Sequence, residues 1–142
     1  MNGLTLPREA EQEALRRFYA AVNRNDVAAA VEPFDQDIEW IEPAENPGAG
    51  TTRGRTNLQA HIAYHRGNWA EGGCEPVRFI AAGDKVVSFV HVRVRLKGAA
   101  EWIEGEHAEV YTFRNGKAVQ KRLFTDTAQA LETARAATVN PD

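Results

Sequence analysis

The sequence predicts an α+β fold, a cone-shaped barrel in which a strongly curved antiparallel sheet wraps around N-terminal helices. Two observations support this class. Three helical patterns and one short β pattern occupy the first half of the chain, and four consecutive β patterns with a closing helix fill the second. Helices segregated from antiparallel strands are typical of α+β proteins. The 142 residues fit a single domain, 1–142, with its core from about 8 to 137.

The first third of the chain is predicted to hold two helices and a strand. Apolar residues at helical spacing predict a helix over 7–25. Asp26 is placed to cap a short second helix over 27–31, which Pro33 ends. Alternation of apolar and polar side chains then predicts a short strand over 37–42.

A long loop and a third helix follow this strand. The stretch 43–54 is rich in Pro, Gly, Ala, Thr and Asn, and long ordered loops often border binding sites. Thr56 and Gln59 form a Thr-x-x-Gln capping box for a helix from 57 to about 69. Gly72-Gly73 then indicates another loop.

The second half is predicted to be an antiparallel meander followed by a helix. Runs of β-branched and aromatic residues mark strands over 77–82, 86–96, 101–113 and 118–124, and a helix runs from 127 to about 137. Asn-Gly at the turn between the last two strands is the strongest short-range signal for a hairpin.

The short turn at 97–100 fixes the register of the strands on either side of it. Continuing the pairing away from the turn places His107 opposite Val90 and Glu109 opposite Ser88. Both titratable groups then lie on an otherwise apolar face. A buried titratable group needs a partner or a function, so this face is the predicted wall of a cavity.

The register of the last strand extends this face, provided that no β-bulge interrupts it. Arg122 then lies opposite Glu109, and Phe124 and Asp126 follow on the same side. The opposite face carries an apolar set that a helix or a second subunit must cover, and few helices remain, so we expect a homodimer. This set comprises Val87, Phe89, Ala108, Val110, Val119 and Leu123.

Composition and motifs exclude several classes of partner. The net charge is −3 and the 17 basic residues are spread along the chain, so nucleic acid is not an expected partner. No apolar run approaches a membrane span, which predicts a cytoplasmic protein with no membrane partner. His61 and His65 have the spacing of a metal pair but lack a third ligand, so we expect no metal and no cofactor.

Each candidate site residue also has a structural explanation. His107 is the strongest acid/base candidate because it titrates near neutrality, although it could be a core histidine bonded to Glu109. Glu109 and Arg122 could form only a cross-strand ion pair, and Asp126 could serve only as the N-cap of the last helix. Glu42 is either a carboxylate at the cavity rim or a base whose pKa is raised by apolar neighbours.

Several segments together resemble the ketosteroid isomerase and SnoaL-like branch of the nuclear-transport-factor-two-like superfamily. These are the run from Leu15 to Asp26, Phe34 with 35–40, Glu42-Pro43, Arg53-Gly54-Arg55, and the runs 113–117 and 122–126. The likeness spans about residues 11–134 and implies a cone-shaped α+β cavity. The superfamily includes isomerases, cyclases, epoxide hydrolases, dehydratases and non-enzymatic binding domains.

The resemblance also implies roles for particular residues. The general base of the steroid isomerases precedes a proline on the first strand, a position that Glu42 occupies here. Their neutral carboxylic acid falls near His107 or Glu109, and their helix tyrosine matches Phe18, with Tyr19 one position away and expected to point elsewhere. In the similar cyclases and epoxide hydrolases, a late aspartate corresponds to Asp126.

These observations predict a cofactor-independent acid/base enzyme, an isomerase, cyclase or hydrolase, acting on a small apolar or amphipathic carbonyl or hydroxyl compound. His107 would be the acid/base group, and Glu42 or Asp126 would be the second catalytic group, a carboxylate. Glu109 is a further catalytic candidate, and Arg122 would orient the reacting groups. The alternative is a non-catalytic ligand-binding or dimerisation domain. The predicted cavity lining comprises Phe18, Trp40, Tyr64, Trp69, Val90, Val92, Ile103, Arg122 and Phe124.

Overall fold

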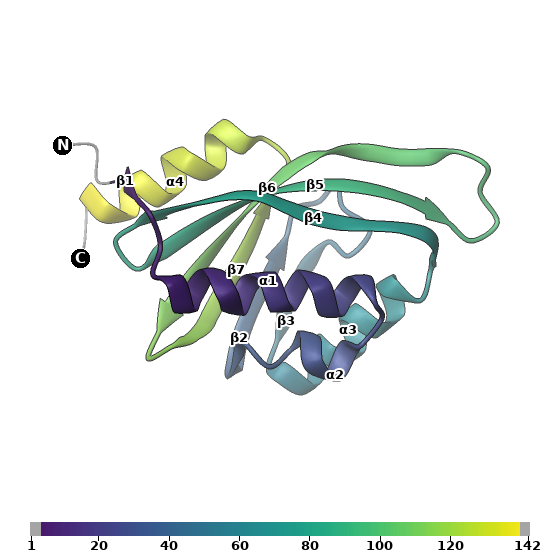
Figure 1. Ribbon diagram of the computed structural model, residues 1–142, viewed down its shortest axis with the longest axis horizontal. Coiled ribbons are helices and arrows are strands. Elements are labelled where there is room, and N and C mark those ends of the chain that lie inside the picture. The colour runs from purple at the N-terminus through teal and green to yellow at the C-terminus, as the bar shows by residue number, and fades with distance from the viewer. Residues whose placement is uncertain (1–3, 140–142) are drawn as a thin grey trace.

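The computed structural model describes residues 4–139, so the first and last three residues of the predicted domain 1–142 lie outside it. Within this range the chain combines four helices with one seven-stranded sheet, which confirms the α+β class (Figure 1). The helices are α1 (Glu9–Asn23), α2 (Val27–Ala30), α3 (Arg55–Arg66) and α4 (Thr127–Val139). The strands are β1 (Leu4–Thr5), β2 (Phe34–Glu42), β3 (Gly50–Arg53), β4 (Trp69–Ala82), β5 (Lys85–Leu96), β6 (Trp102–Arg114) and β7 (Lys117–Phe124).

The sheet has the order β1-β4-β5-β6-β7-β2-β3. Strands β4 to β7 form the predicted antiparallel meander, and β2 pairs with β7 in parallel. Among the described residues, the edge strands β1 and β3 do not pair with each other, so the sheet is curled and open and does not close into a barrel. Figure 1 shows α1, α2 and α3 on one side of this sheet and α4 on the other.

Two apolar clusters stabilise the two faces of the sheet. On the inner face, Phe18 of α1 packs edge-on against Phe34 and Trp40 of β2, with ring centroids 5.1 and 6.0 Å away. On the outer face, α4 packs on a cluster that contains four of the six apolar residues from which the dimer was predicted, Val87, Phe89, Ala108 and Val110, and leaves out Val119 and Leu123. A helix of the chain itself therefore covers this face, and the homodimer stays a prediction without that support.

The register of the first hairpin is as predicted: Val90 pairs with His107, and Ser88 pairs with Glu109. The register of the second hairpin differs from the prediction, because the pairing of β6 with β7 shifts between Thr112 and Phe113. Such a β-bulge places one extra residue on one strand and reverses the facing of everything beyond it. Lys121, not Arg122, therefore points to the inner face beside Glu109.

Two glycine-containing segments that were predicted as loops contain strands of the sheet. The predicted loop at Gly72-Gly73 lies inside β4, and the third helix ends at Arg66 rather than near 69. Gly72 has φ of +104°, and a Cβ there would lie 2.0 Å from the carbonyl oxygen of Arg93. This glycine thus serves a strand irregularity rather than a loop. Strand β3 likewise occupies the end of the predicted loop 43–54.

Candidate functional site

A cavity of about 450 Å³ lies between the inner face of the sheet, α1, α3 and the segment after β2. This volume is within the range of small-molecule sites. Of the predicted residues, those lining it are Phe18, Trp40, Glu42, Trp69, Val90, Val92, Ile103, His107 and Glu109.

Four predicted residues lie elsewhere, and their placement in the cavity was wrong. Tyr64 is 70% exposed on α3. Phe124 packs in the outer cluster beneath α4, and Arg122 lies over its ring. Asp126 caps α4 by accepting hydrogen bonds from the backbone N–H groups of Ala128 and Gln129, at 3.0 and 3.3 Å. The β-bulge explains why the last strand presents its other face to the cavity.

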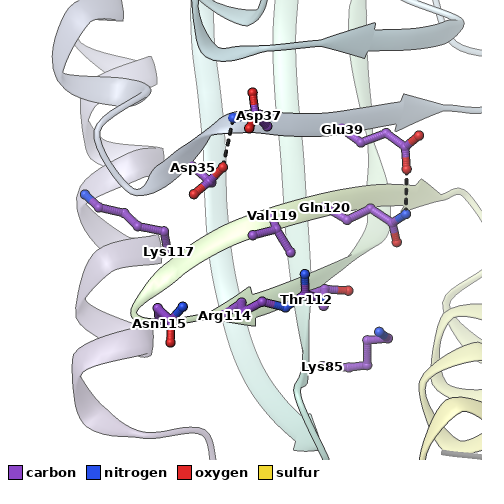
Figure 2. Close-up of a pocket in the computed structure, with 10 residues that line it drawn as sticks. All are labelled: Asp35, Asp37, Glu39, Lys85, Thr112, Arg114, Asn115, Lys117, Val119 and Gln120. Atoms are coloured by element: carbon purple, nitrogen blue, oxygen red, sulfur yellow. Dashed lines mark hydrogen bonds between the residues drawn. The ribbon is translucent and has the colours of Figure 1, made fainter. Parts of the chain in front are cut away.

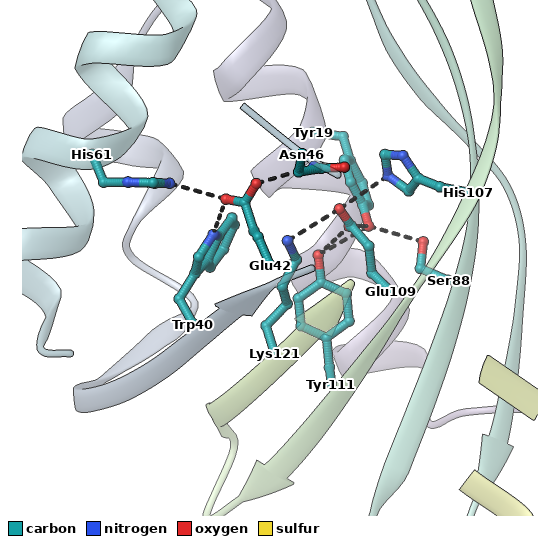
Figure 3. A network of polar contacts seen from close by, with 10 residues as sticks. All are labelled: Tyr19, Trp40, Glu42, Asn46, His61, Ser88, His107, Glu109, Tyr111 and Lys121. Atoms are coloured by element: carbon teal, nitrogen blue, oxygen red, sulfur yellow. Dashed lines mark hydrogen bonds and ion pairs between the residues drawn. The ribbon is translucent and has the colours of Figure 1, made fainter. Parts of the chain in front are cut away.

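Glu109 is the centre of a buried polar network (Figure 3). Its side chain accepts hydrogen bonds from the hydroxyl groups of Tyr19 and Tyr111, the latter at 2.7 Å. Nε2 of His107 lies 3.1 Å from its second oxygen, and Nζ of Lys121 lies 3.4 Å from the same atom. With only 6% of Glu109 exposed, these four groups take the place of water around the carboxylate.

The network keeps Glu109 ionised. Burial by itself would raise its pKa, but the ammonium charge of Lys121 and the hydrogen bonds from His107 and Tyr19 outweigh burial and hold the pKa of Glu109 well below its ordinary range. Burial and the nearby carboxylate raise the pKa of Tyr19 and of Tyr111 well above 10. Both phenols therefore remain neutral donors at physiological pH, and Glu109 can orient other groups but is a weak base.

Lys121 is the cation that accompanies this carboxylate. Its side chain is 1% exposed, and its Nζ lies 3.8 Å from the ring centroid of Trp40. A buried ammonium over an aromatic face gains cation–π attraction in addition to the ion pair with Glu109. The same charge also lowers the pKa of Glu42, so one lysine serves both carboxylates of the cavity.

Glu42 forms a second polar group with residues of β2, α3 and the following loop. Its Oε2 accepts hydrogen bonds from Nε1 of Trp40 at 2.7 Å and lies 2.9 Å from Nε2 of His61, and its Oε1 accepts from Asn46. Burial tends to raise its pKa, but His61, Lys121, Trp40 and Asn46 together lower it to about 2. Of the two alternatives for Glu42, the base with a raised pKa is therefore wrong, because the donors around the carboxylate outweigh the effect of burial.

Gly48 allows the loop after β2 to close over this second group. A Cβ at Gly48 would lie 2.9 Å from the His61 ring and 3.0 Å from Oε1 of Glu42. Real Cβ atoms do not come this close to neighbouring atoms, so a larger residue would push the loop or the histidine aside. Within the Pro- and Gly-rich loop, Gly48 is thus a position where the packing at the site requires glycine.

The two carboxylates hold two histidines in the same way. In each pair the Nε2 atom faces the carboxylate, and Nδ1 has no hydrogen-bond partner among residues 4–139. An ionised carboxylate fixes the tautomer with the proton on Nε2, which leaves Nδ1 as an acceptor. In Figure 3, His61 and His107 lie at opposite ends of the network, with Glu42, Lys121 and Glu109 between them.

Neither a metal nor a reactive thiol is indicated at this site. Within the described part of the chain, no cluster of three or more His, Cys, Asp or Glu side chains could hold a metal ion. Burial, followed by the charge of Glu109, raises the pKa of the Cys74 thiol to about 12. The thiolate is the reactive form of cysteine, so this side chain is inert near neutral pH.

A second hollow, of about 530 Å³, lies along β2, β6 and β7 and has a different character (Figure 2). Its charged side chains are exposed or partly exposed. Glu39 accepts hydrogen bonds from Gln120 and Arg53 at 2.7 and 2.8 Å, and Lys117 donates to the carbonyl of Glu32. This hollow offers no buried acid/base group, and the inner cavity is therefore the candidate site.

Sequence reasoning missed Tyr19, His61, Tyr111 and Lys121. Tyr19 is 2% exposed because α1 buries a wide arc of its surface, so the residue next to Phe18 also turns inward. Lys121 would be assigned to the surface by its residue type alone. Alternation along β6 did place Tyr111 on the face of His107 and Glu109, a signal that could have identified it.

The fold and the cavity define a protein of the nuclear transport factor 2-like class, with a polar network inside a curled α+β sheet. The chain belongs to the SnoaL-like domain family, whose family model matches residues 15–121. The predicted family resemblance is thereby confirmed. A comparison with curated protein sequences finds no significant match. None of the helices in the described range is long and apolar enough to cross a bilayer.

Solved structures share this fold. An NTF2-like protein from Burkholderia xenovorans LB400 is 30% identical with a TM-score of 0.70, over 92% of this chain and 99% of that one. TerC co-crystallised with polyporic acid is 23% identical with a TM-score of 0.73, over 89% and 98%. A protein with a ketosteroid isomerase-like fold from Catenulispora acidiphila DSM 44928, in complex with trimethylamine, is 16% identical with a TM-score of 0.72, over 93% and 95%.

Proposed function

We propose that this protein is a cofactor-independent acid/base enzyme of the ketosteroid isomerase or polyketide cyclase type. Its substrate would be a mostly apolar carbonyl or hydroxyl compound. The observation that supports this most strongly is the pair of His107 and buried Glu109 at the wall of an otherwise largely apolar cavity. A histidine oriented by a fixed carboxylate is a common arrangement for moving protons near neutral pH.

In this proposal His107 is the proton carrier and Glu109 is a positioning residue. Nδ1 of His107 takes a proton from carbon next to the substrate carbonyl, and the electron pair of the broken C–H bond moves to the carbonyl oxygen as an enolate. The imidazolium then returns the proton to a carbon or oxygen of the same molecule. Glu109 stabilises the imidazolium while it exists, and the charge of Lys121 favours the developing enolate.

His61 and Glu42 would form the opposite wall of the reaction site. A protonated His61 retains its hydrogen bond to Glu42 through Nε2 and can donate Nδ1–H to the substrate oxygen. The low pKa of Glu42, about 2, makes it the orienting carboxylate of this pair rather than the base. An acid and a base on opposite sides of a substrate suit isomerisation, ring closure and water addition alike.

The first experiment is a thermal-shift screen of lipophilic ketones, epoxides and alcohols, because a ligand at 100 times its Kd adds about 2.7 kcal/mol of stability. Turnover is then tested with 5-nitrobenzisoxazole, a compact apolar compound whose ring opens once a base removes one C–H proton. His107→Gln should lower its rate by about a hundredfold or more, the usual contribution of a general base.

The control variant is His91→Gln, which removes another histidine paired with a carboxylate, Glu104, at the exposed outer surface. This variant should react as the wild type does, and both variants should melt like the wild type. Equal rates for His107→Gln and the wild type would refute the assignment of His107. Ligands that bind without any turnover of the screened compounds would instead indicate the non-catalytic binding domain.

A further inference from the structure

The cavity has two chemically different ends. One end carries the polar groups described above. The other lies along the far parts of β5 and β6, residues 92–105, which we call the arm. Figure 1 shows this arm projecting beyond the helices. Its cavity-lining side chains are apolar, namely Val92, Val94, Leu96 and Ile103.

The arm exposes apolar surface toward the cavity. Ile103 lines the cavity but is 53% exposed. Its neighbour Trp102 points to the opposite face, where the guanidinium of Arg93 lies 3.9 Å from its ring centroid. Arg93 thus covers the ring of Trp102 on the outer face, whereas Ile103 on the cavity side is left largely open to solvent. An uncovered apolar side chain inside a binding cavity indicates a surface that a ligand buries.

Gly105 connects the two ends. It lies between Ile103 and His107 on the same face of β6, because alternate residues of a strand face the same way. A Cβ at Gly105 would have no atom within 4 Å, so the space above it is open. Ile103 and His107 are four positions apart along the strand, which corresponds to about 13 Å at roughly 3.3 Å per residue.

We propose that the arm binds the apolar tail of the substrate whose reacting head lies at His107. The substrate is then an elongated amphipathic molecule, with a carbonyl or hydroxyl head and an alkyl or aryl tail that passes over Gly105 to Ile103. This inference rests on the function proposed above for its choice of head group.

A series of methyl ketones from butanone to decanone tests the inference. Affinity measured by calorimetry should rise about fourfold for each methylene that the arm buries. The rate at which the hydrogens next to the carbonyl exchange in heavy water, followed by NMR, reports turnover separately. Affinity that does not depend on chain length would overturn the inference, whether or not exchange is catalysed. A chain-length dependence without exchange supports the arm and contradicts the proposed catalysis.

Three variants locate the effect. Gly105→Leu should fill the open space and lower the ratio of decanone to butanone affinity at least tenfold. Ile103→Ser should lower the same ratio by removing apolar surface. Trp102→Ser is the matched control, since it removes a neighbouring exposed apolar side chain from the opposite face of the arm. An equal loss in Trp102→Ser and Ile103→Ser would contradict a tail site on the inner face.

Discussion

Replacing Glu42 by Gln should change the way in which stability depends on acid pH. Burial tends to raise the pKa of this carboxyl, yet His61, Lys121, Trp40 and Asn46 lower it from an ordinary 4.5 to about 2. A carboxyl with a depressed folded-state pKa stabilises the protein above its unfolded pKa. That stability is lost as the pH falls through the folded-state value.

The size of this effect follows from the shift. Each pKa unit corresponds to about 1.4 kcal/mol, so the change from 4.5 to about 2 is worth about 3 kcal/mol. The side chain of Glu42 is only 11% exposed, so solvent screens its electrostatic interactions only a little. The whole contribution is present at neutral pH and disappears between pH 4.5 and about 2.

Urea unfolding from neutral pH down to about pH 2 measures this contribution. The wild type should lose about 3 kcal/mol more than Glu42→Gln over the acid interval. Glu101→Gln is the control, because that carboxylate is exposed, and its profile should follow the wild type. Parallel profiles for Glu42→Gln and the wild type would refute the idea that the donors around Glu42 hold it ionised.

Further predictions concern other parts of the structure. Lys121→Met should lower the unfolding free energy by about 3–5 kcal/mol by leaving Glu109 without its cation, and a loss below about 1 kcal/mol in chemical unfolding would contradict the pair. Asp126→Ala should cost about 1 kcal/mol in thermal unfolding through the lost helix cap, with ligand affinity unchanged. Gly48→Ala should displace His61 and slow turnover of 5-nitrobenzisoxazole, and an unchanged rate would argue against the second histidine. Sizing in solution should find a homodimer, whereas a monomer would contradict that prediction.

Patterns in the sequence predicted the parts of the fold that local geometry determines. The register that brings His107 and Glu109 to one face followed from the short turn at 97–100 and strict alternation on both strands. The prediction of a turn at Asn115-Gly116 was also confirmed, since both residues have positive φ, 53° and 81°. In each case only a few neighbouring residues decide the outcome.

Features that depend on distant contacts could not be predicted. The β-bulge between Thr112 and Phe113 leaves no mark in residue type, yet it exchanges Arg122 for Lys121 at the site. The pairing of Glu42 with His61 joins β2 to α3, and it depends on how the loop between them folds back. A sequence pattern indicates which side chains of one helix or strand share a face, and it says little about contacts between different helices and strands.

The proposed chemistry depends most directly on which ring nitrogen of His107 carries the proton. The nitrogen NMR signals of this imidazole, assigned by comparison with His107→Gln, distinguish the two tautomers. For the neutral form of the ring, the structure predicts the proton on Nε2, bonded to Glu109, and Nδ1 as the free acceptor. Glu109→Gln should abolish this preference. A proton on Nδ1 in the neutral wild-type ring would contradict the assignment of His107 as the base.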